Sequence, residues 1–353
     1  MSPFAIGYFG ALIGASSLAA WSGRREALVG AFLLLVVSAF AGIVWGGAAL
    51  RWITLVVALG AAAVGLAYSF RAFLAAVLPR DAARAIRSAP LTASFGLLTI
   101  LAYIVTAVFA PAIAPFGESQ IVGGAFAPPD DRMLLGGDQL GRDLFSRIVY
   151  GARNTVGIAF VTTVLTFLLG GALGLLAATV GGWVDQLLSR LVDVLMAIPQ
   201  LIFALLLLTI FGTEVVTLIL VIAVLDSTRV YRLSRAVAVN IVVMDYIEAA
   251  KLRGETLWWL ITREILPNAT APLIAEFGLR FCFVFLTIAG LSFLGLGIQP
   301  PTADWGSMVR DNAQLISFGE VTPLIPAAAI ALLTVAVNFV VDWMLQRSSG
   351  LKD

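Results

Sequence analysis

Histidine is absent from this sequence, cysteine occurs once, and only 12% of its 353 residues are charged. Without histidine, the chain has no imidazole to act as a general base, a metal ligand or a proton relay. The lone Cys282 cannot form a disulfide framework or a multi-cysteine metal site. The phosphate-binding string Gly-Lys-Ser/Thr of a P-loop does not occur either, so we expect no nucleotide to bind this chain.

The low content of charged residues is matched by a high content of apolar residues. They make up 60% of the chain, with a mean hydropathy of +1.00, whereas an ordinary soluble domain is roughly 25% charged. Runs without Asp, Glu, Lys or Arg are 1–23, 27–50, 52–70, 88–117, 154–184, 194–213, 281–303 and 321–341. Each reaches the roughly 18 to 20 residues that cross a lipid bilayer as a helix. A weaker candidate, 215–231, carries Asp226 and Arg229 in its last third. We therefore predict an all-α integral membrane protein of about nine transmembrane helices.

The position of the basic residues predicts the orientation. Short loops rich in Lys and Arg remain in the cytoplasm, and this bias places the N-terminus outside and the C-terminus in the cytoplasm. A cleaved signal peptide is the alternative for residues 1–23. Such a peptide needs a positive region before its apolar core, whereas Arg24 and Arg25 follow the core here, which favours a retained helix. The net charge of +1 gives no reason to expect nucleic acid.

Two unequal parts follow from these runs. Residues 1–87 form an N-terminal three-helix membrane extension that ends in a basic cytoplasmic junction from Pro79 to Arg87. Residues 88–353 hold six spans, a polar outer segment at about 116–153 and a long cytoplasmic excursion at about 240–268. We expect the functional residues in the second part.

The excursion reads as two short helices. Met244–Gly254 is a helix stopped by glycine, and Glu255–Leu266 is a second one ended by Pro267. A short helix of this kind can dock in a groove of a partner protein. The alternative is a solvated helix pair on the membrane surface, anchored by Trp258 and Trp259.

The same segment resembles the cytoplasmic coupling signature of permeases from binding-protein-dependent ABC importers. Glu-Ala-Ala at 248–250 is followed after three residues by Gly254, and the thirteen positions from Gly254 to Pro267 agree with that signature. Glu264 departs from it, because the general pattern prefers isoleucine there. The resemblance assigns contact with an ATPase subunit to Tyr246, Glu248, Ala249, Ala250, Gly254, Leu266 and Pro267.

Three further stretches, 134–153, 181–199 and 291–306, resemble the dipeptide, oligopeptide and nickel permeases. With the coupling signature they cover nearly all of residues 88–353 in the expected order. The resemblance implies a six-helix type I ABC importer core and the C-type member of a two-permease pair. It says nothing about residues 1–87.

The function that the resemblance implies is import across the bacterial cytoplasmic (inner) membrane. The chain would be one permease of an ATP-driven importer, for dipeptides or oligopeptides, with nickel complexes or another small solute as the alternative. Its partners would be a homologous second permease, two nucleotide-binding ATPase subunits, an extracytoplasmic solute-binding protein and the lipid bilayer. ATP and Mg²⁺ would bind to the ATPase partners, and this chain would hold no cofactor or metal and catalyse nothing.

Two rival classes fit the residues less well. A self-contained secondary transporter needs ionisable residues near the midplane and often an inverted repeat. An intramembrane enzyme needs a paired nucleophile and base or a carboxylate cluster. We find neither pattern in the predicted spans. Glu276 and Arg280 are spaced i, i+4, and we expect a local ion pair between them, with a substrate contact as the alternative.

The remaining candidate residues lie in the outer segment and in the spans. We expect Asp138, Gly141, Arg142, Asp143 and Arg147 to form a turn-rich outer loop, whose charged side chains pair with each other or with a docked receptor. A remote alternative is a Ca²⁺ site at Asp130, Asp131, Asp138 and Asp143. Candidates for the pathway or a hinge are Pro199, Gly295 and Gly297. A passive kink at Pro199 and plain helix packing at the glycines are the alternatives.

Overall fold

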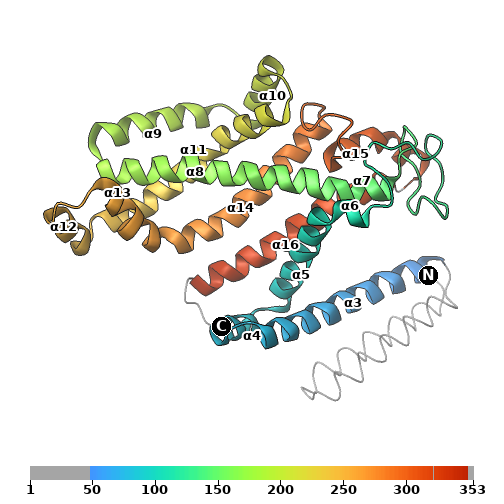
Figure 1. Ribbon diagram of the computed structural model, residues 1–353, viewed down its shortest axis with the longest axis horizontal. Helices are drawn as coiled ribbons and strands as arrows, with labels where there is room; N and C mark the ends of the chain where they lie inside the picture. Colours follow the sequence, from blue (N-terminus) through green and yellow to red (C-terminus); the bar gives the residue numbers. More distant parts are fainter. Residues whose placement is uncertain (1–47, 321, 349–353) are drawn as a thin grey trace. The chain divides into compact units, whose positions relative to one another are not determined.

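The computed structural model describes residues 48–320 and 322–348, and every regular element in these ranges is a helix (Figure 1). The chain divides into two compact units, residues 1–95 and 96–353. Within the described part, extended backbone pairs only at two isolated bridges, one of them between Ile121 and Arg142. The fold class is therefore all-α, as the composition predicts.

The first unit contains a long helix and a short one. Helix α3 spans Ala48–Val77 and α4 spans Arg80–Ser88, with Pro79 as the N-cap residue of α4. Pro79 separates the two helices because it disfavours the helical conformation in the residue before it. The Arg71 guanidinium donates a hydrogen bond to the Ala89 carbonyl, 3.2 Å away. The expected spans 1–23 and 27–50 lie wholly or mostly outside the described residues, whereas 52–70 falls within α3.

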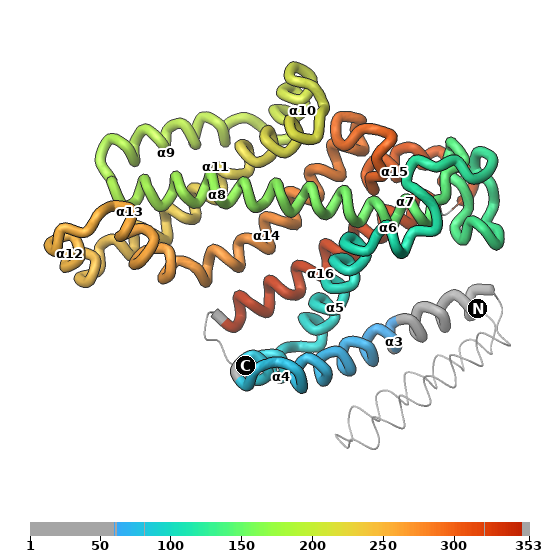
Figure 2. Tube along the Cα trace, viewed as in Figure 1, coloured from blue at the N-terminus to red at the C-terminus, as the bar shows by residue number. Residues whose placement is uncertain are grey.

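The second unit contains the remaining helices. They are α5 (Leu91–Val108, which starts in the first unit), α6 (Ala110–Ile113), α7 (Leu144–Gly151), η1 (Ala152–Val156), α8 (Gly157–Val180), α9 (Gly182–Ala197), α10 (Gln200–Phe211), α11 (Val215–Val242), α12 (Asp245–Leu252), α13 (Leu257–Trp259), η2 (Leu260–Ile265), α14 (Leu266–Phe293), α15 (Trp305–Asn312), η3 (Ala313–Phe318) and α16 (Leu324–Ser348). In Figures 1 and 2, α8 extends from near α13 at one end of this unit to α7 at the other, with α11 and α14 near it. The α12 region lies at one end, and α7, α15 and their loops lie at the other.

Helices α8 and α11 approach each other closely through two glycines of α8. A Cβ at Gly174 would lie 2.6 Å from the Tyr231 carbonyl oxygen, and a Cβ at Gly170 would lie 2.8 Å from Val230 Cβ. This G-x-x-x-G spacing lets two helix backbones meet without intervening side chains. This pair was not predicted from the sequence, where Gly295 and Gly297 were the glycines considered for helix packing.

Aromatic side chains form the centre of the main apolar core. The Trp305 ring makes edge contacts with Tyr103, at 5.6 Å between centroids, and with Phe285, at 6.2 Å. Trp305 is almost fully buried, and its indole N–H donates to the Ile148 carbonyl at 3.0 Å. The loop after α14 is thereby fixed against the start of the α7–α8 helix.

Four helices of the described residues are long and apolar enough to cross a membrane, or five if the bent pair α9–α10 counts as one span. The predicted count of nine is therefore not confirmed. Helix α11 fails the test because charged residues such as Arg232 and Arg235 interrupt it, although it continues to Val242, well beyond the predicted end at 231. The run 281–303 is also out of register, because α14 begins fifteen positions earlier, at Leu266.

Candidate functional site

Two regions at opposite ends of the second unit contain most of the predicted functional residues (Figure 1). We call residues 243–259 the α12 turn. We call a group of polar residues at the other end the polar cap, which consists of the buried Asp138, Arg142, Asp143, Arg147 and Asp304 and the half-buried Glu118.

Helix α12 is anchored by one narrow face. Ile247 and Ala250, three positions apart, are both fully buried and pack in a cluster with Leu260 and Ile265. Ala250 was predicted to contact an ATPase subunit, but its side chain faces the interior of its own chain. Tyr246, Glu248 and Ala249 are exposed, so the predicted contact surface is smaller than the sequence indicated.

Gly254 ends α12 in a Schellman motif. The Gly254 N–H donates to the Lys251 carbonyl at 3.0 Å, and the Glu255 N–H donates to the Ala250 carbonyl at 3.3 Å. Gly254 has φ +80°, a left-handed conformation that glycine adopts without steric cost. No atom lies within 4 Å of a Cβ placed there. The glycine therefore serves the turn itself and leaves space beside it.

Large apolar side chains around this turn are left exposed. Leu252 is 83% exposed and Trp258 is 76% exposed, and Val243 and Leu257 are exposed beside them. Charged residues surround them in the sequence. A cluster of exposed apolar side chains with a polar rim marks a surface that another protein or a membrane covers.

Leu266 and Pro267 lie inside a continuous helix, which differs from the prediction. Helical structure runs from Leu257 to Phe293 without a stop, and Pro267 occupies the first turn of α14. The preceding turn, η2, is a π-helix, in which the Leu266 N–H donates to the Ile261 carbonyl. Because the helix is continuous, the missing N–H of Pro267 leaves a carbonyl of the preceding turn without this donor, at the point where the π-helix η2 passes into α14.

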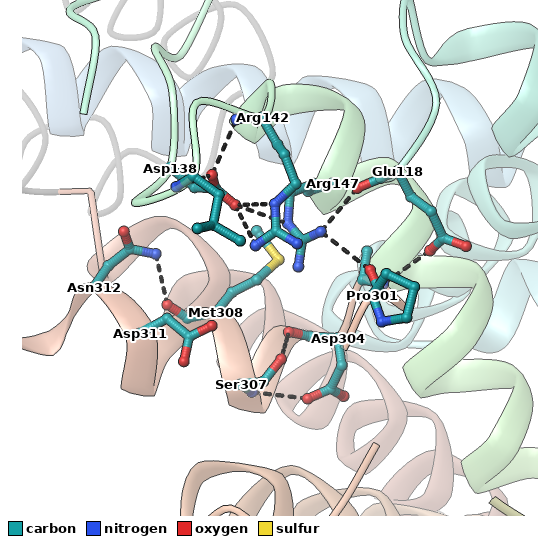
Figure 3. A network of polar contacts seen from close by, with 12 residues as sticks. Glu118, Asp138, Arg142, Arg147, Pro301, Asp304, Ser307, Met308, Asp311 and Asn312 are labelled. Carbon is teal, nitrogen blue, oxygen red and sulfur yellow. Dashed lines mark hydrogen bonds and ion pairs between the residues drawn. The ribbon is translucent and has the colours of Figure 1, made fainter. Parts of the chain in front are cut away.

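At the centre of the polar cap is the Asp138 carboxylate (Figure 3). Its Oδ2 atom accepts a hydrogen bond from Arg142 Nε at 2.7 Å and lies 3.3 Å from Arg147 Nε. Its Oδ1 atom accepts from the backbone N–H groups of Leu140 and Arg142. All three charged residues are nearly fully buried, so their charges are satisfied inside the chain and do not form an accessible docking surface.

Arg147 connects the cap to two distant segments. Its Nη1 atom donates to the Glu118 carbonyl at 2.8 Å and to the Pro301 carbonyl at 3.4 Å, as Figure 3 shows. The Glu118 carboxylate in turn accepts from Asn154 Nδ2 at 2.9 Å and from the Ala303 N–H at 2.8 Å. The loop before α7 and the loop after α14 are therefore held together by charge-assisted hydrogen bonds.

Two aspartates of the polar cap are N-cap residues of helices. Asp143 accepts from the Ser146 N–H at the start of α7, and Asp304 accepts from the Ser307 N–H at the start of α15, both at 2.8 Å. Burial raises the pKa of Asp304, whose other oxygen accepts from Thr155 Oγ1 at 2.9 Å. The suggested Ca²⁺ site is not formed, since no three acidic or cysteine residues gather in the part of the chain that the structure describes.

Glycines of the cap and of the following loop permit close backbone approach. Gly141 has φ +72°, and its amide and carbonyl both bond within the loop. Gly295 has φ +92°, and a Cβ there would lie 3.1 Å from Arg310 Nη1. At Gly297 a Cβ would overlap Ser292, whose hydroxyl accepts from the Ile298 N–H. These contacts give Gly295 and Gly297 a packing role within one tight turn.

Pro199 lies at a sharp break in the helix path. Helix α9 ends at Ala197 and α10 begins at Gln200, and the two helices meet at an angle of 89°. On the preceding side, Gly181 and Gly182 both have positive φ and form the reversal between α8 and α9. The break expected at Pro199 is present.

The ion pair expected between Glu276 and Arg280 is also present, at 2.6 Å. Asp226 and Arg229 were noted from the sequence, but their contact with Gln200 beside the Pro199 break was not predicted. Asp226 lies in the middle of α11 and is fully buried, with Gln200 and Arg229 as hydrogen-bond partners. Asp226 and Arg229 were taken to lie near the end of a short span. Their i, i+3 spacing was the signal that they form a pair.

Comparison with known proteins gives consistent matches. The family described as "Binding-protein-dependent transport system inner membrane component" matches residues 170–349. The dipeptide transport system permease protein DppC of Alkalihalophilus pseudofirmus is 34% identical over 259 residues, which is 73% of this chain and 83% of that protein. The di/tripeptide permease DppC of Pseudomonas aeruginosa is 35% identical over 73% of this chain and 85% of its own length. The glutathione permease GsiD of Pectobacterium atrosepticum is 33% identical over 64% of this chain and 72% of its own length.

Proposed function

Since this chain belongs to the family of binding-protein-dependent transport system inner membrane components, we propose that it is one permease subunit of an ATP-driven importer of dipeptides or oligopeptides. The observation that best supports this proposal is the α12 turn. Its apolar side chains Leu252 and Trp258 are exposed, while the helix is anchored by buried Ile247 and Ala250.

The proposed layout has nine transmembrane helices, a six-helix core in residues 88–353 and three further helices in residues 1–87. Helix α11 counts as a span despite its charges, because these charges form ion pairs with a neighbouring helix or within α11. Arg235 pairs with Asp185 of α9, and Arg229 pairs with Asp226 within α11. Pairing of this kind lowers the cost of a charge inside a membrane. The N-terminus lies outside and the C-terminus lies in the cytoplasm.

The α12 turn docks on a nucleotide-binding ATPase subunit in this proposal. ATP and Mg²⁺ bind to two such partners, and this chain performs no hydrolysis. A partner moves the permease only if it contacts the turn differently in its ATP-bound and ATP-free states. The short α12 suits this role, since the buried Ile247 and Ala250 fix it to α11 and to η2. Movement of the turn is then transmitted to the long helices as a rigid displacement.

At the other end, the polar cap fixes the loops that face the extracytoplasmic solute-binding protein. The buried ion pairs of Asp138 hold these loops in shape, and exposed residues such as Leu134 and Leu140 are left to contact the receptor. A second, homologous permease completes the translocation path. The break at Pro199 provides a hinge beside that path.

Peptides are the proposed solutes because the relatives are named for them. The permeases of Alkalihalophilus and Pseudomonas are named for dipeptides and for di- and tripeptides, and that of Pectobacterium is named for glutathione, itself a small peptide. Nickel complexes are the alternative that the test below distinguishes.

Reconstitution tests the proposal directly. Proteoliposomes containing this chain, its second permease and the ATPase subunits, with receptor outside and ATP inside, should accumulate radiolabelled di-, tri- or tetra-alanine. Omission of this chain, of the receptor or of ATP should each abolish accumulation. Uptake of ⁶³Ni²⁺ without peptide uptake would contradict the peptide assignment, and peptide uptake by this chain alone would contradict the subunit role.

A further inference from the structure

A cavity of about 180 Å³ opens at the break between α9 and α10. It is several times larger than the roughly 30 Å³ that one water molecule occupies in the liquid. Its lining consists of Leu195, Met196, Ile198, Pro199, Gln200, Leu225, Thr228 and Arg229. The wall thus combines apolar side chains with polar surface, and the polar side chains are Gln200, Thr228 and Arg229. Convergent polar groups beside apolar side chains can fix the orientation of a small molecule in a cavity.

The Arg229 guanidinium is only partly used by its own chain. Its Nη1 atom donates to Asp226 Oδ1 at 3.0 Å and to the Gln200 amide oxygen. Among the described residues, its Nε and Nη2 atoms have no hydrogen-bond partner, and its side chain is 41% exposed. A guanidinium carries five N–H donors in a planar fork. One edge of the fork is therefore anchored and the other is open.

Asp226 holds the Arg229 guanidinium at the edge of the cavity. Its side chain is fully buried, and its two oxygens accept from Arg229 Nη1 and, at 2.8 Å, from Gln200 Nε2. A buried carboxylate needs such partners, because an unpaired charge in a medium of low polarity is strongly unfavourable. Asp226 and Gln200 therefore act as positioning residues for Arg229. Gln200 is the first residue of α10, so its bond to Asp226 also holds the start of α10 against α11.

We propose that Arg229 binds the terminal carboxylate of the transported peptide in the α9–α10 cavity. This inference rests on the proposed function. A carboxylate is the ligand because its two oxygens match the planar fork of a guanidinium. The apolar wall at Leu195, Met196 and Leu225 packs against the adjoining residue of the peptide. Broken helices that present polar groups to a solute are a recurrent feature of transport paths.

The test compares two solutes that differ only in this group. Proteoliposomes with the complete transporter receive the alanine peptide that is transported best, or the same peptide with a C-terminal amide. Receptor loading is titrated separately, so that each rate is expressed per loaded receptor. Wild type should transport the free acid about tenfold faster than the amide, which is the size of effect of one charge-assisted hydrogen bond. Arg229→Gln should reduce this ratio to near one by slowing the acid.

Arg232→Gln is the matched control, since Arg232 lies on the same helix and forms an exposed pair with Asp193; it should keep the wild-type ratio. An unchanged ratio in Arg229→Gln, or no preference in wild type, would overturn the inference while leaving peptide import intact. Absence of uptake of either peptide by wild type and by Arg232→Gln would instead contradict the proposed function.

Removal of Arg229 alone leaves the Asp226 charge unpaired and can prevent folding. The double variant Asp226→Asn with Arg229→Gln removes both charges together, and its ratio should also be near one. If both variants fail to assemble with the second permease, Arg229 is part of a subunit interface, and the solute site is refuted.

Discussion

The polar cap and the α12 turn use charged and apolar residues in opposite ways. In the cap, Asp138, Arg142 and Arg147 are buried and satisfied inside the chain. In the α12 turn, Leu252 and Trp258 are exposed. A region whose charged groups form ion pairs inside the chain holds a fixed shape. A region that exposes its apolar groups needs a partner to cover them.

A glycine with positive φ does not by itself identify a contact surface, because its surroundings differ between the two regions. Both regions carry glycines with positive φ, such as Gly141 and Gly254. Around Gly141 the backbone is close-packed, whereas around Gly254 there is open space. The same residue type thus closes a rigid loop in one region and leaves space for a partner in the other. The following predictions are ordered by their expected effect on the stability of the chain.

Asp138→Asn should destabilise the chain most. It removes the anion that Arg142 and Arg147 share and leaves two buried guanidinium groups without their ion-pair partner, a loss of about 3 to 5 kcal/mol. The thermal midpoint of the purified chain in detergent measures it. Arg132→Ala in the same loop is the control, since Arg132 is exposed and only its backbone N–H makes a hydrogen bond. Equal midpoints for the two variants would show that the cap is not held by its charges.

Gly174→Ala should cost about 1 to 3 kcal/mol, because the added methyl group forces α8 away from the Tyr231 carbonyl of α11. Gly171→Ala is a close control, since a Cβ there meets only Ser234 Oγ at 4.0 Å. Thermal unfolding of both variants gives the comparison. If Gly171→Ala is the more destabilised, the assignment of Gly170 and Gly174 as the packing contact is wrong.

Several helices could be predicted from charge-free runs alone. The helices whose predicted bounds were wrong have one physical cause in common. The run 154–184 contains α8, and 321–341 largely coincides with α16. Helices α11 and α14 were cut short because counting stops at a charge. In the fold, those charges find partners on other helices or one turn away, as Arg235 does with Asp185 and Arg280 with Glu276.

The candidate sites show the same limit. Sequence alone left open whether Asp138, Arg142 and Arg147 pair with each other or with a docked receptor, because their environment depends on residues as distant as Pro301. Ala250 belongs to the coupling signature, yet which face of α12 is buried is decided by packing on Leu260 and Ile265. The α9–α10 cavity could not be predicted, because Gln200 and Arg229 are brought together only by the break.

Leu252→Asp should have the smallest effect on the chain itself. The side chain is 83% exposed, so the free energy of unfolding should change by no more than about 0.5 kcal/mol. If the turn docks on an ATPase subunit, however, a buried carboxylate at that interface should prevent co-purification of the ATPase. Retention of the ATPase at the wild-type ratio would show that Leu252 faces lipid or water.

The central claim is that the α12 turn couples this permease to ATP hydrolysis, and ATP-dependent peptide uptake by the assembled complex with Gly254→Asp tests it most directly. Open space surrounds this position, and aspartate tolerates a positive φ better than most residues, so the chain should fold. Gly319→Asp is the control, because Gly319, directly after η3, also has a left-handed conformation, with φ +79°, and open space around it. We predict that Gly254→Asp abolishes uptake while the complex remains assembled and that Gly319→Asp transports normally. Normal uptake with Gly254→Asp would contradict the coupling role.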